Sequence, residues 1–379
     1  MVLLILACVV SGFVISCLAT AGMRWLAPRV GLIDQPNAAR KVHAHPTPLG
    51  GGLGVLAGVV VPLLAGLAVV TAVASGGLSD QWLPEVLREH VAGVLAKRGA
   101  LVALLAGGLV ISALGLLDDL RPLAWRPKLL VQFLVAGGLV ASGVRATVFT
   151  QAPWVGDLIT LLWIVGLTNS FNFLDNMDAL SGGIGLISAT VFATILLTAT
   201  ATPHWFVAAF LLLIAGSLAG FLVHNRPPAK IFMGDAGSCL IGLWIASLTV
   251  LGTFYDEQQA GRHVILAPLC VLAVPLYDFC SVILIRLRQG RSPFHADKSH
   301  FSHRLVELGL SKTSAVLTIH LVTLMTGLAG LLLYQVRGWT GALVVMALVL
   351  CALAVIGILE TAGRLRRHSE QQSVTGRQS

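Results

Sequence analysis

The chain is built from apolar runs of about twenty residues, the length that an α-helix needs to cross the hydrocarbon core of a bilayer. Hydrophobic residues make up 56% of the 379 residues and charged residues 11%, and the mean hydropathy is +0.87. These values exclude an ordinary water-soluble domain. Because backbone polar groups must be satisfied internally in a membrane, the runs predict helices and the chain an all-α polytopic membrane protein.

Division into such runs gives about eleven transmembrane helices. The first run has no basic segment before it and is too long for a signal peptide, so we interpret it as a retained span. We expect one integral-membrane domain over residues 1–379, with a basic cytoplasmic tail at 362–379. The expected spans are 3–23, 51–75, 99–117, 129–145, 157–174, 180–201, 205–223, 236–254, 263–285, 314–334 and 340–362.

The basic residues predict the orientation of these spans. Of the 25 lysines and arginines, 19 fall in one alternate set of loops and six in the other. The positive-inside rule makes the richer set cytoplasmic, with the N-terminus outside and the C-terminus inside. This distribution explains the net charge of +8 without a nucleic-acid partner. The richer set comprises 24–50, 118–128, 224–235, 286–313 and the tail.

A polar stretch, NSFNFLDNMDALSGG at 169–183, separates two apolar runs. Its Asn169, Asn172, Asp175 and Asp178 recur every three residues, so an ideal helix would rotate each by roughly 60° from the last. Such a fan suits residues that surround a ligand, or a helix end that unwinds. A polar loop whose side chains cap the next helix is an equal alternative. Acids at membrane depth are costly and usually face a cavity, a cation or a substrate.

Three further acids lie at predicted cytoplasmic helix ends. Asp118 and Asp119 are adjacent, and their mutual repulsion is relieved by a cation or a shared proton, as in a Mg²⁺ site or a general base. Asp235 lies between Gly234 and Gly237 at the start of a span. It could ligate Mg²⁺ together with waters and substrate phosphates, or it could cap the helix.

Two basic loops belong to the same face. The loop at 31–52 contains Lys41 and ends in glycines, and it could hold phosphate oxygens or adhere to anionic lipid. The loop at 286–313 contains His300 and His303, which would share a face on a helix. No thiolate or HExxH pattern accompanies these histidines, so anion binding is favoured over zinc.

Together these loops bring acids and cations to one predicted face of the bundle. Catalysis of phosphoryl transfer is chiefly positioning and charge neutralisation, and a Mg²⁺-dependent site for phosphates uses such groups. A site embedded in the membrane implies that one substrate is a lipid. The acids are Asp118, Asp119, Asp175, Asp178 and Asp235.

Five ordered motifs between residues 31 and 305 resemble those of the polyprenyl-phosphate N-acetylhexosamine-1-phosphate transferases. They are RKVHAHPTPLGG, LGLLDDLRP, NSFNFLDNMDALSGG, FMGDAGS and DKSHFSHRL. The resemblance implies that a polyprenyl phosphate, such as undecaprenyl phosphate, attacks the β-phosphorus of a UDP-N-acetylhexosamine and releases UMP. It implies Mg²⁺ as cofactor, which Mn²⁺ could replace, and a bacterial cytoplasmic (inner) membrane. The product would initiate a lipid-linked cell-envelope polysaccharide; whether the chain forms a homodimer is left open.

The resemblance also implies residue roles. Asp118 and Asp119 would be the acidic pair, one of which deprotonates or orients the lipid phosphate. Asp235 would ligate Mg²⁺, and Asp175 is a second candidate metal ligand. Substrate binding would fall to Lys41, Asn172, Asp175, Asp178, His300, His303 and Arg304.

The chain departs from the family pattern at three positions. Asn176 and Ala179 stand where the family usually has the glycines of DGxDG, and Ser302 stands where a further histidine is usual. The branch that transfers phospho-N-acetylmuramoyl-pentapeptide typically has consecutive histidines, whereas this chain has HFSH. We therefore favour transfer of GlcNAc-1-phosphate or a similar sugar phosphate, with the pentapeptide transferase as the alternative.

A secondary transporter is an alternative of another class. Asp278, inside the ninth span, and Asp175 would then be coupling sites, and Asp278 should have a partner from another polar loop. Transporters usually have related halves and polar groups near the midplane. This chain has no evident internal repeat, and most of its acids lie at helix ends. A non-catalytic scaffold is disfavoured because all five acids are present.

Overall fold

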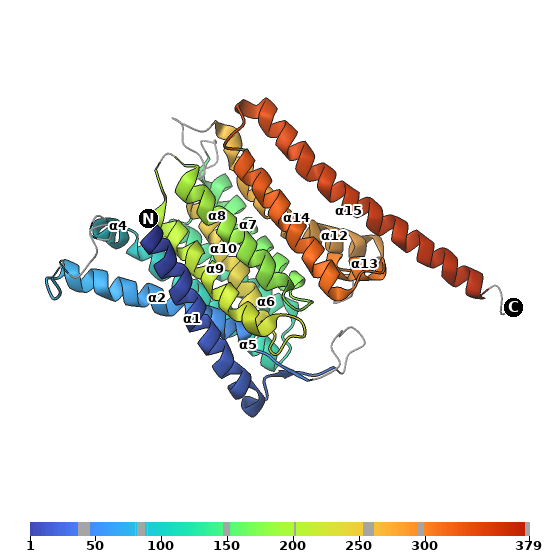
Figure 1. Ribbon diagram of the computed structural model, residues 1–379, viewed down its shortest axis with the longest axis horizontal. Coiled ribbons are helices and arrows are strands. Elements are labelled where there is room, and N and C mark those ends of the chain that lie inside the picture. The colour runs from blue at the N-terminus through green and yellow to red at the C-terminus, as the bar shows by residue number, and fades with distance from the viewer. Residues whose placement is uncertain are drawn as a thin grey trace.

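The computed structural model describes residues 1–36, 46–79, 81, 88, 90–146, 152–200, 202–252, 261–293 and 299–375, with the backbone alone for 362–375. Helices form a bundle along which α14 and the long α15 run side by side, with the two termini far apart (Figure 1). The elements are α1 (Val2–Leu26), η1 (Ala27–Val30), β1 (Ile33–Asp34), β2 (Thr47–Pro48), α2 (Gly51–Ala74), α4 (Val91–Ala96), α5 (Arg98–Leu120), α6 (Trp125–Ala141), α7 (Pro153–Leu174), α8 (Leu180–Thr198), α9 (Trp205–Asn225), α10 (Asp235–Leu251), η3 (Arg262–Leu266), α11 (Ala267–Val271), α12 (Ala273–Arg288), α13 (Phe301–Glu307), α14 (Lys312–Leu332) and α15 (Gly338–Thr375).

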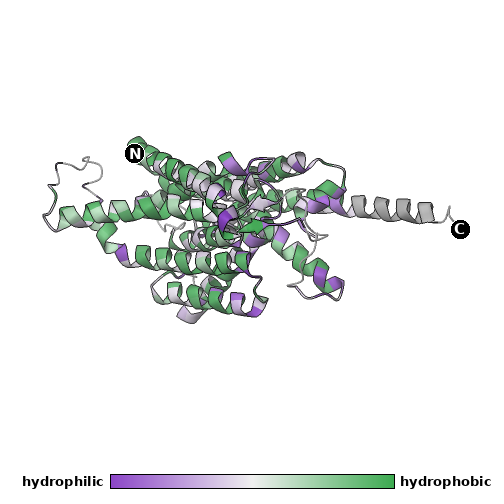
Figure 2. Ribbon diagram, turned by 90° about the horizontal axis from the view of Figure 1, so that it is seen from below, coloured by the Kyte–Doolittle hydropathy of each residue, from purple (hydrophilic) through white to green (hydrophobic). Residues whose placement is uncertain are grey.

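The predicted all-α, multi-pass fold is confirmed, since every expected span falls on helical structure. In the described part of the chain, eight helices are long and apolar enough to cross a membrane, and one bent pair is a ninth candidate. Helices α6 and α10 have 17 residues each, about 26 Å of helix against a hydrocarbon core of about 30 Å. Hydrophobic residues cover the long helices, while hydrophilic ones gather mainly at helix ends and connections (Figure 2). The number of crossings stays a prediction.

The ninth expected span, 263–285, is a bent pair of helices and not one straight helix, so its crossing of the membrane stays a prediction. The helical pair Arg262–Val271 and Ala273–Arg288 is bent by 66°. Pro275 lacks a backbone N–H and its ring clashes with the carbonyl four residues earlier, which belongs to Val271. Helix α11 ends at Val271 for this reason.

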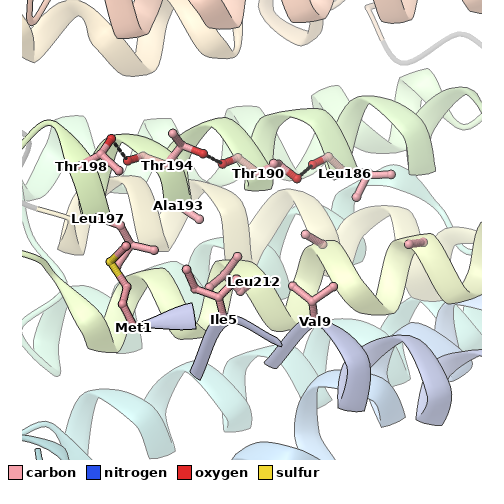
Figure 3. A pocket seen from close by; sticks show the side chains of 12 residues that line it. Met1, Ile5, Val9, Leu186, Thr190, Ala193, Thr194, Leu197, Thr198 and Leu212 are labelled. Atoms are coloured by element: carbon pink, nitrogen blue, oxygen red, sulfur yellow. Dashed lines mark hydrogen bonds between the residues drawn. The ribbon is translucent and has the colours of Figure 1, made fainter. Parts of the chain in front are cut away.

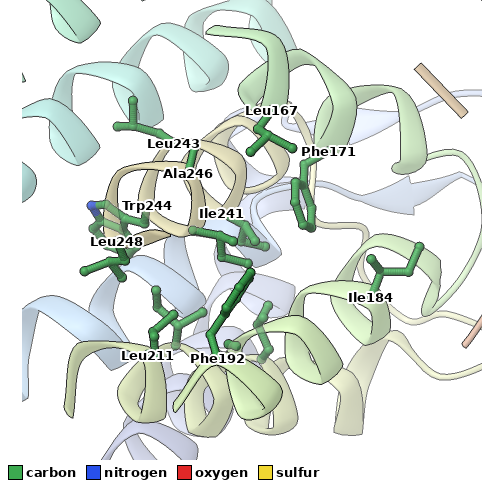
Figure 4. Packing of buried hydrophobic residues seen from close by; sticks show 14 of the residues in the cluster. Leu167, Phe171, Ile184, Phe192, Leu211, Ile241, Leu243, Trp244, Ala246 and Leu248 are labelled. Carbon is green, nitrogen blue, oxygen red and sulfur yellow. The ribbon is translucent and has the colours of Figure 1, made fainter. Parts of the chain in front are cut away.

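Helix α10 lies at the centre of the bundle. It packs against α5 and α7 and also contacts α2, α8 and α9, and every residue from Ala236 to Thr249 is buried. The indole of Trp244 donates a hydrogen bond to the carbonyl of Leu104 at 2.9 Å and stacks edge-on with Phe210. Figure 4 shows apolar side chains of α7, α8 and α9 around it. A helix that is apolar on all sides requires such burial.

Glycines bring α1 close to α2 and α9, as the small-residue spacings in the sequence predict. A Cβ atom on Gly54 would collide with Thr20, and one on Gly58 with the hydroxyl of Ser217. Gly216 and Gly220 likewise press against backbone carbonyls of α1. These glycines therefore let the three helices pack closely.

Several connections meet at one end of the bundle. The N–H of Gly51, at the start of α2, donates to the carbonyl of Phe232, and the N–H of Phe232 donates to the carbonyl of Pro48, both at 2.9 Å. The loop that precedes α2 is therefore joined to the loop that precedes α10. The ends of α5 and α7 reach the same place through the contacts of their acids.

Candidate active site

The site is centred on the N-terminus of α10. Gly234 precedes this helix with φ 76° and ψ 173°. Asp119, at the end of α5, accepts hydrogen bonds from the N–H groups of Asp235 at 3.0 Å and Ala236 at 3.3 Å. The capping alternative for Asp235 is wrong, because Asp119 satisfies these groups and the Asp235 side chain makes no cap bond. A carboxylate at a helix N-terminus is also favoured by the helix dipole.

Lys128 joins Asp118 to Asp235. Its ammonium donates to Oδ2 of Asp118 at 2.6 Å and lies 3.6 Å from Oδ2 of Asp235. The other oxygen of Asp118 accepts the N–H of Leu123 at 2.6 Å. The carboxyl groups of Asp118 and Asp235 thus lie beside the same ammonium, and each perturbs the charge state of the other. Two neighbouring carboxyl groups require a shared proton or a nearby cation.

The end of α7 supplies two more groups. The Asn172 amide donates to Oδ1 of Asp235 at 2.8 Å and to the hydroxyl of Ser238 at 3.1 Å. This pair of bonds sets the orientation of the Asp235 carboxylate. Asp175, immediately after α7, lies close enough to Asp235, Asp119 and the N–H of Gly234 for each of them to affect the pKa of its carboxyl.

Desolvation raises the pKa of the Asp175 carboxyl well above its usual value of 3.8. The neighbouring carboxylates of Asp235 and Asp119 raise it further, while the nearby backbone N–H of Gly234 opposes the shift. Together with Asp118, four carboxyl groups thus gather around one helix start. Lys128 contributes one positive charge to this cluster, which leaves these five side chains with excess negative charge.

The four polar residues diverge at a helix end, which agrees with the unwinding alternative and not with a continuous helix. That they surround a ligand stays a prediction. Helix α7 ends at Leu174. Asn169 faces α6, where its amide donates to Gln132 at 2.6 Å, whereas Asn172 and Asp175 face α10. Asp178 turns to the loop after α9 and accepts the N–H of Ala229 at 2.9 Å. The fan therefore holds several segments, and Asp178 lies at the edge of the cluster.

Ala179 follows Asp178 with a left-handed backbone. Its φ is 64°, a region in which a Cβ atom costs roughly 1–2 kcal/mol and which favours glycine. Its N–H donates to the side-chain carbonyl of Asn225 at 2.8 Å, and this bond holds the turn before α8. The family's usual glycine at this position thus has a conformational explanation.

Residues 300–303, the histidine segment, are anchored by Asp278. This fully buried acid accepts a bond from Nδ1 of His300 at 3.0 Å and from the N–H of Phe301 at 2.6 Å. The expectation that Asp278 has a partner from another polar loop is confirmed. His300 precedes α13 with an extended backbone, so it does not share a helical face with His303. Their ring centroids are 6.3 Å apart.

Arg304 faces the protein interior and not the acidic cluster. Its guanidinium donates to the hydroxyl of Ser281 at 2.8 Å and pairs with Oε2 of Glu360 at 3.2 Å. Tyr277 donates to the same Glu360 oxygen at 3.1 Å. The Arg304 and Glu360 side chains are 3% and 5% exposed. The structure thus gives Arg304 an anchoring contact, and its predicted role in substrate binding stays a prediction.

The structure brings Asp118, Asp119, Asn172, Asp175 and Asp235 together, whereas the predicted ligand Lys41 lies outside the described residues. Ser238 was not expected as a site residue from the sequence, and Lys128 was anticipated only as one of the cations near the acidic pair that could serve anionic groups. Lys128 follows Asp118 by ten positions, and the turn between α5 and α6 separates them, so helical periodicity could not predict their contact. Its basic character beside the pair was the available signal.

The donor set fits a hard divalent cation. Among the described residues, no three histidine, cysteine or acidic side chains converge as a ready-made metal cage. Mg²⁺, however, is commonly held by one or two carboxylates together with waters and substrate phosphates. The carboxyl groups of Asp118 and Asp235, both beside Lys128, and that of Asp175 would supply oxygen ligands and the negative charge that such an ion would balance.

An apolar groove of about 370 Å³ lies elsewhere, between α1, α8 and α9 (Figure 3). Met1 and Thr198 line it, and they belong to the ends of α1 and α8 that are remote from the site. Thr190, Thr194 and Thr198 donate to carbonyls of their own helix along one wall. The groove contributes no group to the acidic cluster.

Comparison with known proteins identifies related sequences. Residues 101–253 match the family described as Glycosyl transferase family 4, a range that contains the acidic cluster but not the histidine segment. A Bacillus subtilis protein, named a probable undecaprenyl-phosphate N-acetylglucosaminyl 1-phosphate transferase, is 30% identical over 90% of this chain and 89% of its own length.

Two further relatives carry similar names. The decaprenyl-phosphate N-acetylglucosaminephosphotransferase of Mycolicibacterium smegmatis is 36% identical over 81% of this chain and 77% of its own length. The undecaprenyl-phosphate alpha-N-acetylglucosaminyl 1-phosphate transferase of Escherichia coli K12 is 28% identical over 85% of this chain and 82% of its own length. The likeness thus extends over most of the chain, well beyond the range of the family match.

Proposed function

This chain belongs to glycosyl transferase family 4, and from that premise we propose that it transfers N-acetylglucosamine-1-phosphate from UDP-GlcNAc to a polyprenyl phosphate and releases UMP. The observation that carries the proposal is the acidic cluster at the start of α10, where Lys128 and Asn172 hold Asp235. The names of the relatives support the sugar and the lipid class. The product would be a lipid-linked diphosphosugar that initiates a cell-envelope polysaccharide.

The reaction is a phosphoryl transfer. An oxygen of the lipid phosphate forms a bond to the β-phosphorus of the UDP-sugar, and the bond from that phosphorus to the bridging oxygen breaks. UMP leaves with this oxygen and the electron pair. A phosphate monoester has a second pKa of about 6 and is mainly a dianion at neutral pH. Most lipid molecules therefore need no base, and orientation of the phosphate is the task that remains for the acidic pair.

We assign Mg²⁺ to Asp235, which Asn172 orients, and to the neighbouring Asp175. When bound, the ion would neutralise phosphate charge and align the diphosphate. The ordered oxygens of Asp235 suit this role because Asn172 and Lys128 restrict its side chain. Lys128 adds positive charge beside Asp118, which lowers the repulsion between the acidic cluster and an incoming phosphate.

We place the site on the cytoplasmic side of a bacterial inner membrane, with the N-terminus outside. The basic residues support this orientation, because 19 of 25 fall in the loops on the side of the site. UDP-sugars are polar and would approach from water, while the polyprenyl chain would remain in the bilayer. His300 and His303 lie in one of these loops and are proposed to bind phosphate or sugar.

The test is UMP release by the purified full-length protein with undecaprenyl phosphate and Mg²⁺. Parallel reactions contain UDP-GlcNAc, UDP-GalNAc or UDP-MurNAc-pentapeptide. We expect release with UDP-GlcNAc that requires both lipid and Mg²⁺, with Mn²⁺ as a partial substitute. The variant Asp235→Asn should raise the Mg²⁺ concentration needed for half-maximal rate by about tenfold or more, since one charged ligand is lost.

Two outcomes would contradict the proposal. Release from folded protein only with UDP-MurNAc-pentapeptide would assign the chain to the other branch. The absence of release with any sugar would direct attention to transport assays. A rate that is independent of metal, with lipid-dependent turnover intact, would remove the assignment of Mg²⁺ alone.

A further inference from the structure

Two departures from the family pattern, Asn176 and Ser302, contact each other. The hydroxyl of Ser302 donates to Oδ1 of Asn176 at 2.5 Å, across 126 positions of the sequence. We infer that this bond is a positioning link, which holds the histidine segment of α13 in place relative to the turn that carries Asp175. The inference rests on the proposed function, because it assigns both segments to one reaction.

The orientation of the Asn176 amide is set on both sides. Its nitrogen donates to the carbonyl of Phe173 at 2.7 Å, so its oxygen must face Ser302. Ser302 is 1% exposed, and a buried hydroxyl left without an acceptor is costly. The bond is therefore specific in direction, and its donor is buried.

The two partners stand next to the predicted site residues. Asn176 directly follows Asp175, and Ser302 lies between His300 and His303. A small displacement at either partner thus moves candidate substrate ligands. Positioning errors of about 1 Å can cost a large factor in rate.

A second contact connects the same two segments as the Asn176–Ser302 link. The ring of Phe173, in the last turn of α7, meets the ring of His300 edge-on at 5.6 Å between centroids. The guanidinium carbon of Arg286 also lies over the Phe173 ring, 5.0 Å from its centroid. Helix α13 itself packs on α14 and α15. The Ser302 bond therefore connects a group of C-terminal helices to the end of α7.

The test is a double-mutant cycle with Asn176→Ala, Ser302→Ala and the double variant in the full-length protein. Turnover is measured as UMP release with undecaprenyl phosphate, UDP-GlcNAc and Mg²⁺, and kcat and KM are separated. We expect each single variant to lower kcat about threefold to tenfold, the range for one neutral hydrogen bond. The kcat of the double variant should be no lower than that of the less active single variant, because the same bond is removed in all three.

Conservative and matched variants separate positioning from general damage. Ser302→Thr keeps the hydroxyl and should retain more of the rate than Ser302→Ala. Ser247→Ala removes another buried hydroxyl, which bonds within α10 to the carbonyl of Leu243, and should leave kcat close to that of the wild type. Equal rates for all variants, or losses that multiply in the double variant, would overturn the inference.

A readout without turnover keeps this inference distinct from the proposed function. Amide hydrogen exchange of residues 301–307 should speed up in Asn176→Ala, although the substituted residue lies in another segment. If wild-type protein released no UMP but this exchange still responded, the proposed reaction would fail while the link stood. Unchanged exchange in folded Asn176→Ala would refute the link itself.

Discussion

The Asp119 carboxylate, at the end of α5, accepts the first backbone N–H groups of α10, those of Asp235 at 3.0 Å and Ala236 at 3.3 Å. An acid from one helix thus caps another helix whose first residue is the candidate metal ligand. Any change at position 119 therefore acts both on charge and on the placement of Asp235.

Substitution Asp119→Asn should abolish turnover while UDP-sugar binding remains measurable. An asparagine amide has one acceptor oxygen, whereas the N–H groups of Asp235 and Ala236 each need one. We therefore also expect a loss of about 1 kcal/mol in stability, as for the loss of a helix cap. UMP release, nucleotide binding and thermal unfolding in detergent check these outcomes. The matched control is Asp157→Asn. Asp157 lies in the first half of α7, and its carboxylate pairs with Arg145. Normal turnover in Asp119→Asn would remove it from the catalytic machinery.

Gly234→Ala should inactivate the protein. Position 234 has φ 76°, and a Cβ atom there would collide with the Asp119 carboxylate. Relief of the clash must move Asp119 or the start of α10, so turnover should fall by at least about a hundredfold, as for a shift of about 1 Å at a reacting group. Gly166→Ala, in the middle of α7 with open space at its Cβ position, should change turnover little. Comparable activity of the two variants would contradict the geometry.

Lys128→Met should impair turnover more than it impairs folding. The ammonium bridges Asp118 at 2.6 Å and Asp235 at 3.6 Å, and a hydrogen bond to a charged group is worth about 1.5–3 kcal/mol. We expect kcat/KM to fall by roughly 10- to 150-fold, with part of the loss recovered at higher Mg²⁺. Lys97→Met, at an exposed position before α5, is the control. An unaltered Mg²⁺ response in Lys128→Met would argue against charge balance as the role of this lysine.

Ala179→Gly should stabilise the protein by about 1 kcal/mol, because glycine removes the left-handed strain at φ 64°. Thermal unfolding in detergent measures the change. Ala199, which follows α8 with φ −110°, carries no such strain, so Ala199→Gly should be neutral or slightly destabilising. Destabilisation by Ala179→Gly would show that the Cβ of Ala179 makes contacts that outweigh the strain.

For the buried Arg304–Glu360 pair, we expect the stability changes of the two single variants not to add up in the double variant. Removal of one partner from a buried ion pair costs about 3–5 kcal/mol, whereas replacement of both by apolar residues is often tolerated. Glu360→Leu alone should therefore lower the unfolding temperature, and Arg304→Met with Glu360→Leu should recover most of it. The double variant also tests whether Arg304 binds substrate, as the sequence predicts. A raised KM for UDP-GlcNAc at restored stability would support substrate binding, and a normal KM would leave anchoring as its function.

The sequence was sufficient for the helical, multi-pass class of fold and for the locations of its helices. Hydropathy over twenty residues is a local property, and the membrane converts it directly into helices. The sequence also indicated which acids meet, since Asp118, Asp175 and Asp235 all stand at helix ends on one predicted side. Relatives with closely similar names accord with the resemblance of its motifs.

Tertiary structure alone decided the partners of these residues. Asp119 caps α10, Arg304 pairs with Glu360, and Ser302 meets Asn176. These partners lie 56 to 126 positions apart in the chain, and no periodicity or spacing connects them. Their contacts depend on how separate helices pack, and packing follows the shapes of many side chains at once. The sequence by itself therefore determined which groups reach the site, and the packed bundle determined what each of them holds.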